Sequence, residues 1–183
     1  MRLKIEGVKI DKLHDDNQVE YTIIGDASLH VKEHKLAWCC MTLNRDGAGN
    51  ILYGTQNGVS DIQTSELIPY STALHYLLVQ LGADTDYDLG RYKPRVHIVT
   101  DSANIEMQFT TNSSSTHTEG LWRQIGLYKN NYFDLAVSHK TRRSHPTLSF
   151  CDTAAKALAE EHGSLEGVIN DILKRFNKPL RGL

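Results

Sequence analysis

The sequence has few cysteines and no sign of a disulfide framework. Only three of its 183 residues are cysteine, and no two of them form a CxxC pair. Cys39 and Cys40 are neighbours within an apolar run, and Cys151 lies far from them along the chain. This usage argues against both a disulfide scaffold and a zinc knuckle, and it predicts buried thiols in a reducing compartment.

The charge balance lacks an excess of either sign. The formal net charge is −2, from 20 basic and 22 acidic residues. Overall charge therefore indicates no polyanionic partner, and an argument for nucleic-acid binding must rest on local clusters. The N-terminal segment MRLKIEGVKIDK also lacks a continuous apolar stretch, so we predict neither a signal peptide nor a membrane span there. We expect a soluble, cytoplasmic protein and favour a monomer.

Length and composition favour a single domain over residues 1–183. The chain is 40% hydrophobic, which is enough to bury one substantial core, and it shows no internal repeat. The predicted core spans about residues 19–161. Residues 1–18 are a candidate extra edge strand, and residues 164–183 are predicted to form a C-terminal helical extension.

The first half of the chain predicts three strands and a helix. Apolar runs bounded by turn residues indicate strands at 19–26, 35–43 and 51–54, which together suggest an antiparallel meander. From Thr64 onward the apolar residues recur every three or four positions, which indicates a helix with Thr64 or Ser65 as its cap. Pro69 would then fall within or just past the first turn, where its missing N–H has little effect.

The second half continues with alternating strands and helices. The pattern predicts a buried strand ending at Asp101, two helices, another strand to Ser138 and two closing helices, the last capped by Ser164. The stretches 84–95 and 110–118 are polar and are predicted to be an inserted loop and a flexible loop. The predicted fold class is α/β, with a five-stranded mixed sheet (three antiparallel strands, then parallel ones) and helices on both faces.

Four acidic residues occupy unusual places in this pattern. Asp26 and Asp101 each end an apolar strand, in YTIIGD and VHIVTD, where a desolvated carboxylate is costly without a cation or hydrogen bonds. If the two strands are parallel neighbours, both acids meet at one sheet edge. Glu66 and Asp152 lie in the opening turns of helices, where the helix dipole favours anions. Each acid alone is equally well explained as a helix or turn cap.

Taken together, the four acids and their contexts resemble ribonuclease H of the bacterial type. The segment HPTLSFCDTAAKALA, residues 145–159, is similar to the family's His-Pro pair followed by a Cys-Asp pair and an alanine-rich helix. The segments SELIPY, TDSANI and LWRQIG and the strand after LWRQIG also resemble the family, in the same order, so that the resemblance covers about residues 19–161. It implies a ribonuclease H-like fold. Only one short helix and a Ser/Thr loop separate Asp101 from Trp122, as in forms without the basic protrusion.

The resemblance also implies a metal-dependent nuclease. Hydrolysis of a phosphodiester needs an in-line water and neutralisation of charge on the reacting phosphate, and two divalent ions provide both. Four carboxylates suit Mg²⁺ or Mn²⁺, and the sequence does not indicate zinc. By resemblance, Asp26 would bridge both ions, Glu66 and Asp101 would hold one of them, and Asp152 the other.

The family carries a further catalytic histidine on the loop before a late helix. Counting back from Asp152 without a gap places Arg142 at that position, whereas alignment from the end of the preceding strand selects His139. We take His139 as the catalytic candidate and His145 as a structural residue. That His139 is simply a solvated loop histidine is an equal alternative.

The expected substrate is an RNA–DNA hybrid, whose RNA strand would be cut to leave 5′-phosphate and 3′-hydroxyl ends. Small polar residues near the first strand and the Glu66 helix would read 2′-hydroxyl groups, and a basic loop cluster would contact phosphates. The candidates are Ser28, Gln63, Thr64 and Ser102 for the first role and Lys140, Arg142 and Arg143 for the second.

Two departures from the family pattern leave alternatives open. Asp26 is followed by Ala27 where the family has glycine, and Ile62-Gln63 stand where the family has paired asparagines. A nuclease acting on DNA, like integrases and resolvases, and a catalytically silent nucleic-acid-binding module therefore remain alternatives.

The last helix also has two possible roles. Its basic end, with Lys174, Arg175, Lys178 and Arg181, could grip nucleic acid. Its continuous apolar stripe favours packing on the core instead, because that stripe would otherwise be exposed.

Overall fold

A computed structural model describes residues 1–6, 8, 19–59, 61–83, 91–111 and 119–181. The predictions for residues 9–18, for most of the insertion 84–95 and for the polar loop 112–118 lie outside this part of the chain. The elements are β1 (Arg2–Ile5), β2 (Val19–His30), η1 (Val31–Glu33), β3 (Lys35–Asn44), β4 (Gly49–Asn57), α1 (Ile62–Ala83), β5 (Arg95–Thr100), α2 (Ala103–Thr111), α3 (Glu119–Asn131), β6 (Asp134–His139), η2 (Arg142–Ser144), α4 (Pro146–Glu160) and α5 (Leu165–Arg181).

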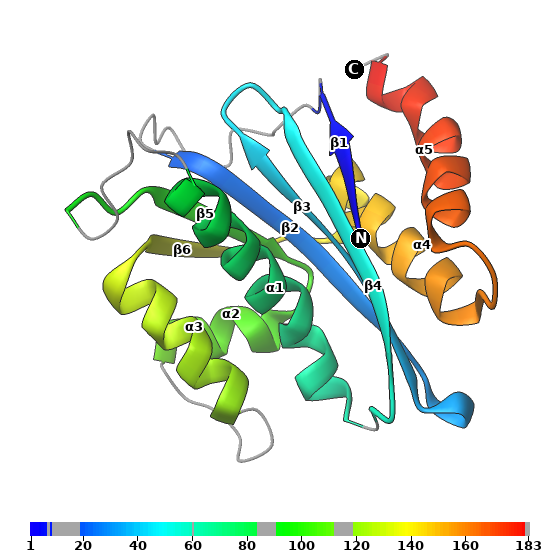
Figure 1. The fold of residues 1–183 in the computed structure, drawn as a ribbon, viewed down its shortest axis with the longest axis horizontal. Helices are drawn as coiled ribbons and strands as arrows, with labels where there is room; N and C mark the ends of the chain where they lie inside the picture. Colours follow the sequence, from blue (N-terminus) through cyan, green and yellow to red (C-terminus); the bar gives the residue numbers. More distant parts are fainter. Residues whose placement is uncertain (7, 9–18, 60, 84–90, 112–118, 182–183) are drawn as a thin grey trace.

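The strands form one mixed sheet in the order β1-β4-β3-β2-β5-β6 (Figure 1). The meander β2-β3-β4 is antiparallel, and β5 and β6 continue the sheet in parallel beside β2. The predicted count of five strands is therefore wrong by one. The sixth is β1, which pairs antiparallel with β4 from Arg2↔Leu52 to Ile5↔Gly49 and is the edge strand suggested for the N-terminal segment.

Strand β2 is longer than predicted, and its two neighbours follow it for different distances. The antiparallel pairing with β3 runs the whole way to His30↔Lys35, so Asp26 lies within the strand and not at its end. The parallel pairing with β5 stops at Ile24↔Val99. Asp26 thus lies two residues beyond the last parallel pair, at the point where β2 and β5 separate.

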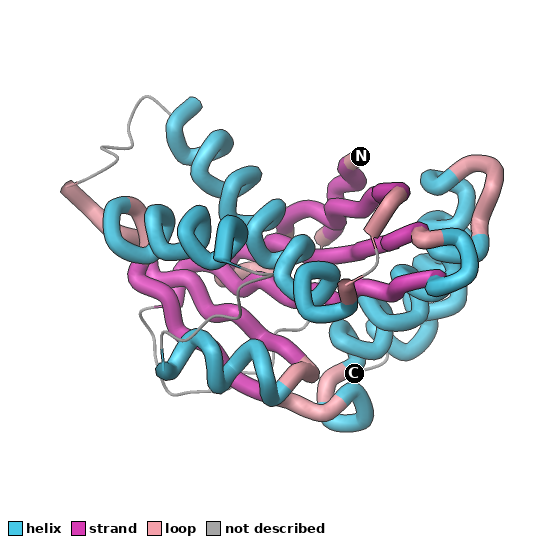
Figure 2. The backbone as a smooth tube through the Cα atoms, turned by 90° about the horizontal axis from the view of Figure 1, so that it is seen from below, coloured by secondary structure: helices cyan, strands magenta, loops and turns pink. Residues whose placement is uncertain are grey.

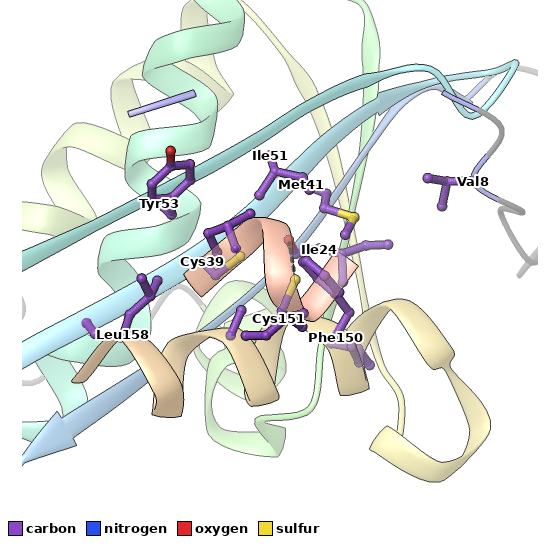
Figure 3. Packing of buried hydrophobic residues seen from close by; sticks show 14 of the residues in the cluster. Val8, Ile24, Cys39, Met41, Ile51, Tyr53, Phe150, Cys151 and Leu158 are labelled. Atoms are coloured by element: carbon purple, nitrogen blue, oxygen red, sulfur yellow. Dashed lines mark hydrogen bonds between the residues drawn. The ribbon is translucent and has the colours of Figure 1, made fainter. Parts of the chain in front are cut away.

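Helices cover both faces of the sheet, as predicted (Figures 1 and 2). One face packs against α4 and α5, and the other packs against α1, α2 and α3. Figure 3 shows the first cluster, in which Phe150 and Cys151 of α4 lie against Ile24 and Met41 of the sheet. The apolar stripe of α5 joins this cluster through the fully buried Ile169 and Ile172, which confirms the predicted core packing of the last helix.

The helix starts only partly match the prediction. Helix α1 begins at Ile62, and the residue that caps it is Asp61, whose Oδ2 accepts a 3.1 Å hydrogen bond from the Thr64 amide. The predicted caps, Thr64 and Ser65, lie inside the helix, and so does Pro69, beyond the first turn. In α5 the predicted cap is confirmed, because Ser164 Oγ accepts a 3.1 Å bond from the Gly167 amide.

All three cysteines are free and buried, as expected from their small number and spacing. Within the described residues, no helix combines the length and apolar character that crossing a bilayer would require.

Candidate active site

Three of the four predicted acids meet where β2 and β5 separate. Asp26 belongs to β2, Asp101 directly follows β5, and Asp152 lies on α4. Their side chains are between 11% and 16% exposed. The guanidinium of Arg142, on the short turn η2, lies among them and contacts all three, with nitrogen–oxygen distances of 3.5 Å to Asp26, 2.5 Å to Asp101 and 3.0 Å to Asp152.

The β2 strand is fixed beside the site by contacts from both helical layers. On one face, the thiol of Cys151 donates to the carbonyl oxygen of Ile24 over 3.7 Å (Figure 3). Cys151 directly precedes Asp152 on α4, so this contact helps to fix where Asp152 lies relative to β2. On the other face, the buried hydroxyl of Tyr70 donates a 2.8 Å hydrogen bond to the carbonyl oxygen of Gly25. The backbone next to Asp26 is therefore held by contacts from both faces of the sheet, from α4 on one side and α1 on the other.

The fourth acid, Glu66, reaches the same region from α1. Its Oε2 accepts a 3.2 Å hydrogen bond from the hydroxyl of Ser102, the residue after Asp101. Burial raises the pKa of Glu66, the Ser102 hydrogen bond opposes this rise, and the carboxylates of Asp101 and Asp61 add to it. Glu66 is thus linked through Ser102 to the segment that carries Asp101.

Among the acids of the site, Asp26 has a strongly raised pKa. Burial, followed by the nearby carboxylate of Asp101, raises the pKa of Asp26 from 3.8 to about 7, although the Ala27 amide and the Arg142 guanidinium lower it. Its Oδ2 is buried and has no hydrogen-bond partner. The positive charge nearest to this oxygen is the Arg142 guanidinium, at 3.5 Å, and a bound cation would add a direct partner.

The donor set fits a hard divalent cation. All four acids offer carboxylate oxygens, which are the ligands that Mg²⁺ and Mn²⁺ prefer, and Oδ2 of Asp26 is buried without a hydrogen-bond donor. Among the described residues, no group of three or more acidic, histidine or cysteine side chains is already arranged to hold a metal ion. The positive charge between the three aspartates comes from Arg142.

The structure places the two candidates for the loop position differently. His139 ends β6, with Nε2 3.1 Å from the backbone oxygen of Asp101, so its ring is anchored next to the acids. Arg142, which the count back from Asp152 without a gap selected for the loop position, lies among the carboxylates themselves. His145 is 2% exposed and precedes the first residue of α4.

The candidate substrate residues belong to β2, the first turn of α1, the segment after β5 and the basic loop. Ser28 is half-buried on β2, two residues after Asp26, and the hydroxyl of Thr64 is bound by Asp61 at 2.5 Å. The side chain of Gln63 lies outside the described part of the structure. Lys140 and Arg143 flank Arg142 along the basic loop, with Arg143 exposed.

Sequence reasoning missed two supporting residues. Tyr70 is one of the residues that recur every three or four positions after Thr64, and nothing in that pattern shows that its hydroxyl donates a hydrogen bond to Gly25. Asp61 precedes Thr64 by three residues, the spacing of a side-chain cap, and this signal was available in the sequence.

Comparison with known proteins identifies the fold. No family model and no curated protein sequence matches the chain. Among solved structures, it is similar to the N-terminal RNase H domain of Rv2228c from Mycobacterium tuberculosis, solved as a fusion with maltose binding protein, with a TM-score of 0.55 and 13% identity over 86% of this chain and 98% of that one.

Two further structures agree. RNase H1 from the halophilic archaeon Halobacterium salinarum NRC-1 matches with a TM-score of 0.54 and 14% identity, over 74% of this chain and 96% of its own. LC11-RNase H1, solved in complex with an RNA/DNA hybrid, matches with a TM-score of 0.56 and 15% identity, over 72% and 93%. The chain therefore has a ribonuclease H-like fold, as its sequence predicted.

Proposed function

We propose that this chain is a metal-dependent endonuclease that hydrolyses the RNA strand of RNA–DNA hybrids. The observation that carries the proposal is the convergence of Asp26, Asp101 and Asp152 from three separate elements on one point, with Glu66 linked to the same segment through Ser102. Buried carboxylates repel one another, so a cluster of them is costly unless cations bind there, which supports a metal site.

These four side chains would hold two Mg²⁺ or Mn²⁺ ions. Bound there, the ions would activate a water molecule and neutralise charge on the phosphate that is cut. The protein's contribution is to keep the carboxylates in place, because Tyr70 fixes the backbone before Asp26 and Ser102 fixes the carboxylate of Glu66.

His139 is the candidate for proton transfer. A backbone carbonyl only accepts hydrogen bonds, so Nε2 of His139 must carry the proton that points at the oxygen of Asp101. In the neutral ring Nδ1 is then the nitrogen that can accept a proton. This tautomer is suited to a residue that takes a proton during cleavage or product departure.

The proposed substrate preference rests on the surroundings of the acids. The solved LC11-RNase H1 contains an RNA/DNA hybrid, and it shares this chain's fold. Ser28, Thr64 and Ser102 supply small polar groups for contact with 2′-hydroxyls, and Gln63 is proposed for the same role from the sequence alone. Lys140 and Arg143 would add phosphate contacts, which increase affinity without reading sequence.

One observation favours the alternative of a DNA substrate. Ile62, at the start of α1, is 53% exposed, so an apolar side chain stands where an amide would be expected to face a hybrid. A nuclease of the same fold and metal chemistry that cuts DNA is therefore the second candidate.

A cleavage assay with end-labelled substrates separates the candidates. The chain is incubated with a hybrid, duplex RNA, duplex DNA and branched DNA, each with Mg²⁺, Mn²⁺ or a chelator. We expect cleavage of the hybrid only with metal, loss of that activity in Asp26→Asn, and normal activity in the matched control Asp171→Asn, an exposed residue of α5.

Each other outcome has a definite meaning. Cleavage that persists with the chelator contradicts the metal-dependent proposal, and cleavage of only DNA establishes the alternative substrate. Binding of the hybrid without any cleavage, together with thermal stability that Mg²⁺ leaves unchanged, establishes a silent binding module.

A further inference from the structure

We propose that Arg142 is the resident counter-cation of the metal-free site, and that its guanidinium must leave the carboxylates before divalent ions can bind. This inference rests on the metal-dependent part of the proposed function. It concerns what the Arg142 side chain does when a metal ion binds.

The geometry shows one cation serving three acids. Each of the three guanidinium nitrogens of Arg142 contacts a different carboxylate: Nη2 contacts Asp26, Nε contacts Asp101 and Nη1 contacts Asp152. The only other cation found at these acids within the described residues is Lys156, which contacts Asp152 alone, at 3.0 Å. The mutual repulsion of the three acids is therefore relieved mainly by Arg142.

Arg142 and a metal ion compete for the same atoms. The oxygens that the guanidinium engages are Oδ2 of Asp26, Oδ2 of Asp101 and Oδ1 of Asp152. Divalent ions bind such oxygens directly, at about 2.0–2.1 Å for Mg²⁺. A guanidinium and a divalent ion between the same three side chains would also repel each other, since both are positive.

The turn that carries Arg142 allows its side chain to move while the acids stay. The Arg142 side chain is 45% exposed, whereas none of the three aspartates is more than 16% exposed. The η2 turn is closed by its own hydrogen bond, from the Ser144 amide to the Thr141 carbonyl at 3.1 Å, which does not involve the guanidinium. Rotation of the long side chain into solvent is thus sufficient to free the carboxylates.

This arrangement links two binding events. Because metal and guanidinium exclude each other, metal binds the wild-type site more weakly than it would bind the same acids without Arg142. Metal loading also releases Arg142 onto a loop that already carries Lys140 and Arg143, and so increases the positive charge available to a phosphate backbone.

Calorimetric titration with Mn²⁺, in the absence of nucleic acid, tests the inference. The variant is Arg142→Gln, and the matched control is Arg143→Gln, which removes the same charge one residue along the same turn. We expect Arg142→Gln to bind Mn²⁺ about tenfold more tightly than wild type, and Arg143→Gln to stay within about twofold, since only the first change removes a direct competitor.

Thermal unfolding gives a second readout in the same proteins. With a chelator present, Arg142→Gln should melt at a lower temperature than Arg143→Gln, and the difference should shrink or reverse when Mn²⁺ is added. Equal or weaker Mn²⁺ binding by Arg142→Gln than by Arg143→Gln overturns the inference.

A measurement on the unaltered protein covers the case in which the variant does not fold. In an NMR titration with Mg²⁺, the Nε–H resonance of Arg142 should move from a hydrogen-bonded to a solvent-exposed position, while that of Arg143 stays in place. An unmoved Arg142 signal at metal saturation overturns the inference. Tighter Mn²⁺ binding by Arg142→Gln in a protein that cleaves no substrate supports the counter-cation role while contradicting the nuclease proposal.

Discussion

The hydroxyl of Tyr70 donates a buried 2.8 Å hydrogen bond to the carbonyl oxygen of Gly25, the residue that precedes Asp26. This bond joins α1 to the central strand at the position where the parallel ladder has ended. It also fixes the position of the backbone next to Asp26 relative to α1.

Replacement of Tyr70 with Phe should therefore destabilise the fold. We expect a loss of about 1–2 kcal/mol in the free energy of unfolding, because the Gly25 carbonyl is left buried without its donor. Urea denaturation at fixed pH measures this. The control is Tyr76→Phe on the same helix, whose hydroxyl takes part in an exposed hydrogen bond with Arg2 and should change stability by less than about 0.5 kcal/mol. Equal effects in the two variants would contradict the structural role of Tyr70.

Gly25 should tolerate no side chain. A Cβ added there would lie 3.0 Å from the Cβ atoms of both Cys40 and Pro69, one on the neighbouring strand and one on α1. Gly25→Ala should cost about 1–3 kcal/mol through overpacking, whereas Gly120→Ala, in α3 with open space around it, should stabilise the protein by about 0.5–1 kcal/mol. If this packing is correct, the denaturation midpoint falls below that of wild type in the first variant and rises above it in the second.

The raised pKa of Asp26 makes metal-free stability depend on pH. Because the folded-state pKa of about 7 exceeds the ordinary value of 3.8, the folded protein holds this proton more tightly than the unfolded chain. The resulting stabilisation is complete below the ordinary pKa and is lost as the pH rises toward the folded-state value. Relative to Asp26→Asn, wild type should lose at most about 4 kcal/mol between about pH 4 and pH 8.

This prediction is checked by urea unfolding of both proteins in a chelator across that pH range. A constant difference between wild type and Asp26→Asn would show that the carboxyl is not perturbed. Added Mg²⁺ should reverse the trend for wild type at the upper end of the range, because the ionised carboxylate then has a partner.

Ser102 has two roles that one substitution removes together. Its hydroxyl donates to Glu66 and also accepts a 3.3 Å bond from the Ile105 amide in the first turn of α2. Ser102→Ala should cost about 0.5–2 kcal/mol of stability, as for other lost helix caps, and should reduce cleavage of the proposed substrate. Ser102→Thr keeps the hydroxyl and should recover most of both properties; failure of Thr to do so would argue against a hydroxyl-based role.

The last helix should act through its apolar side and not through its charges. Ile172 is fully buried in the core cluster between the sheet, α4 and α5. Ile172→Ala should therefore destabilise the protein by about 2–5 kcal/mol. Lys174→Gln changes an exposed residue two positions later and should leave stability within about 0.5 kcal/mol. Thermal unfolding measures the first effect, and the hybrid affinity of Lys174→Gln tests whether the basic end grips nucleic acid.

Much of the fold could be predicted from the sequence because its signals are local. The alternating and 3.6-residue patterns located the strands and helices, and the Ser164 cap was readable because capping spacing is a local property. The pairing of β1 with β4 could not be read, since the pattern around Leu3 and Ile5 indicates a strand but says nothing about its partner. For the same reason the sequence did not show that β2 continues past Asp26.

For the site too, local features could be predicted from the sequence and long-range contacts could not. Asp26 and Asp101 could be picked out because each follows an apolar run, whereas Glu66 and Asp152 were selected by their places at helix starts and by the family resemblance. Parallel pairing of β2 with β5 was enough to predict that Asp26 and Asp101 lie together. One alignment selected Arg142 for the loop beside the acids, but its ion pairs with all three aspartates could not be predicted, because they depend on how far a loop side chain reaches between elements that are distant in sequence. Counting residues along the loop aligns it with the family, but only the tertiary structure shows which way the Arg142 side chain points.

The amide of Ala27 donates a 2.8 Å hydrogen bond to Oδ1 of Asp26, at the point where β2 has lost its parallel neighbour. The proton of such an amide is sensitive to the charge on the oxygen that accepts it. A single backbone resonance, that of Ala27, is therefore a built-in spectroscopic reporter of the ionisation state of the central carboxylate. It could be followed by nuclear magnetic resonance in the unaltered protein, without a substrate and without a label attached to the site.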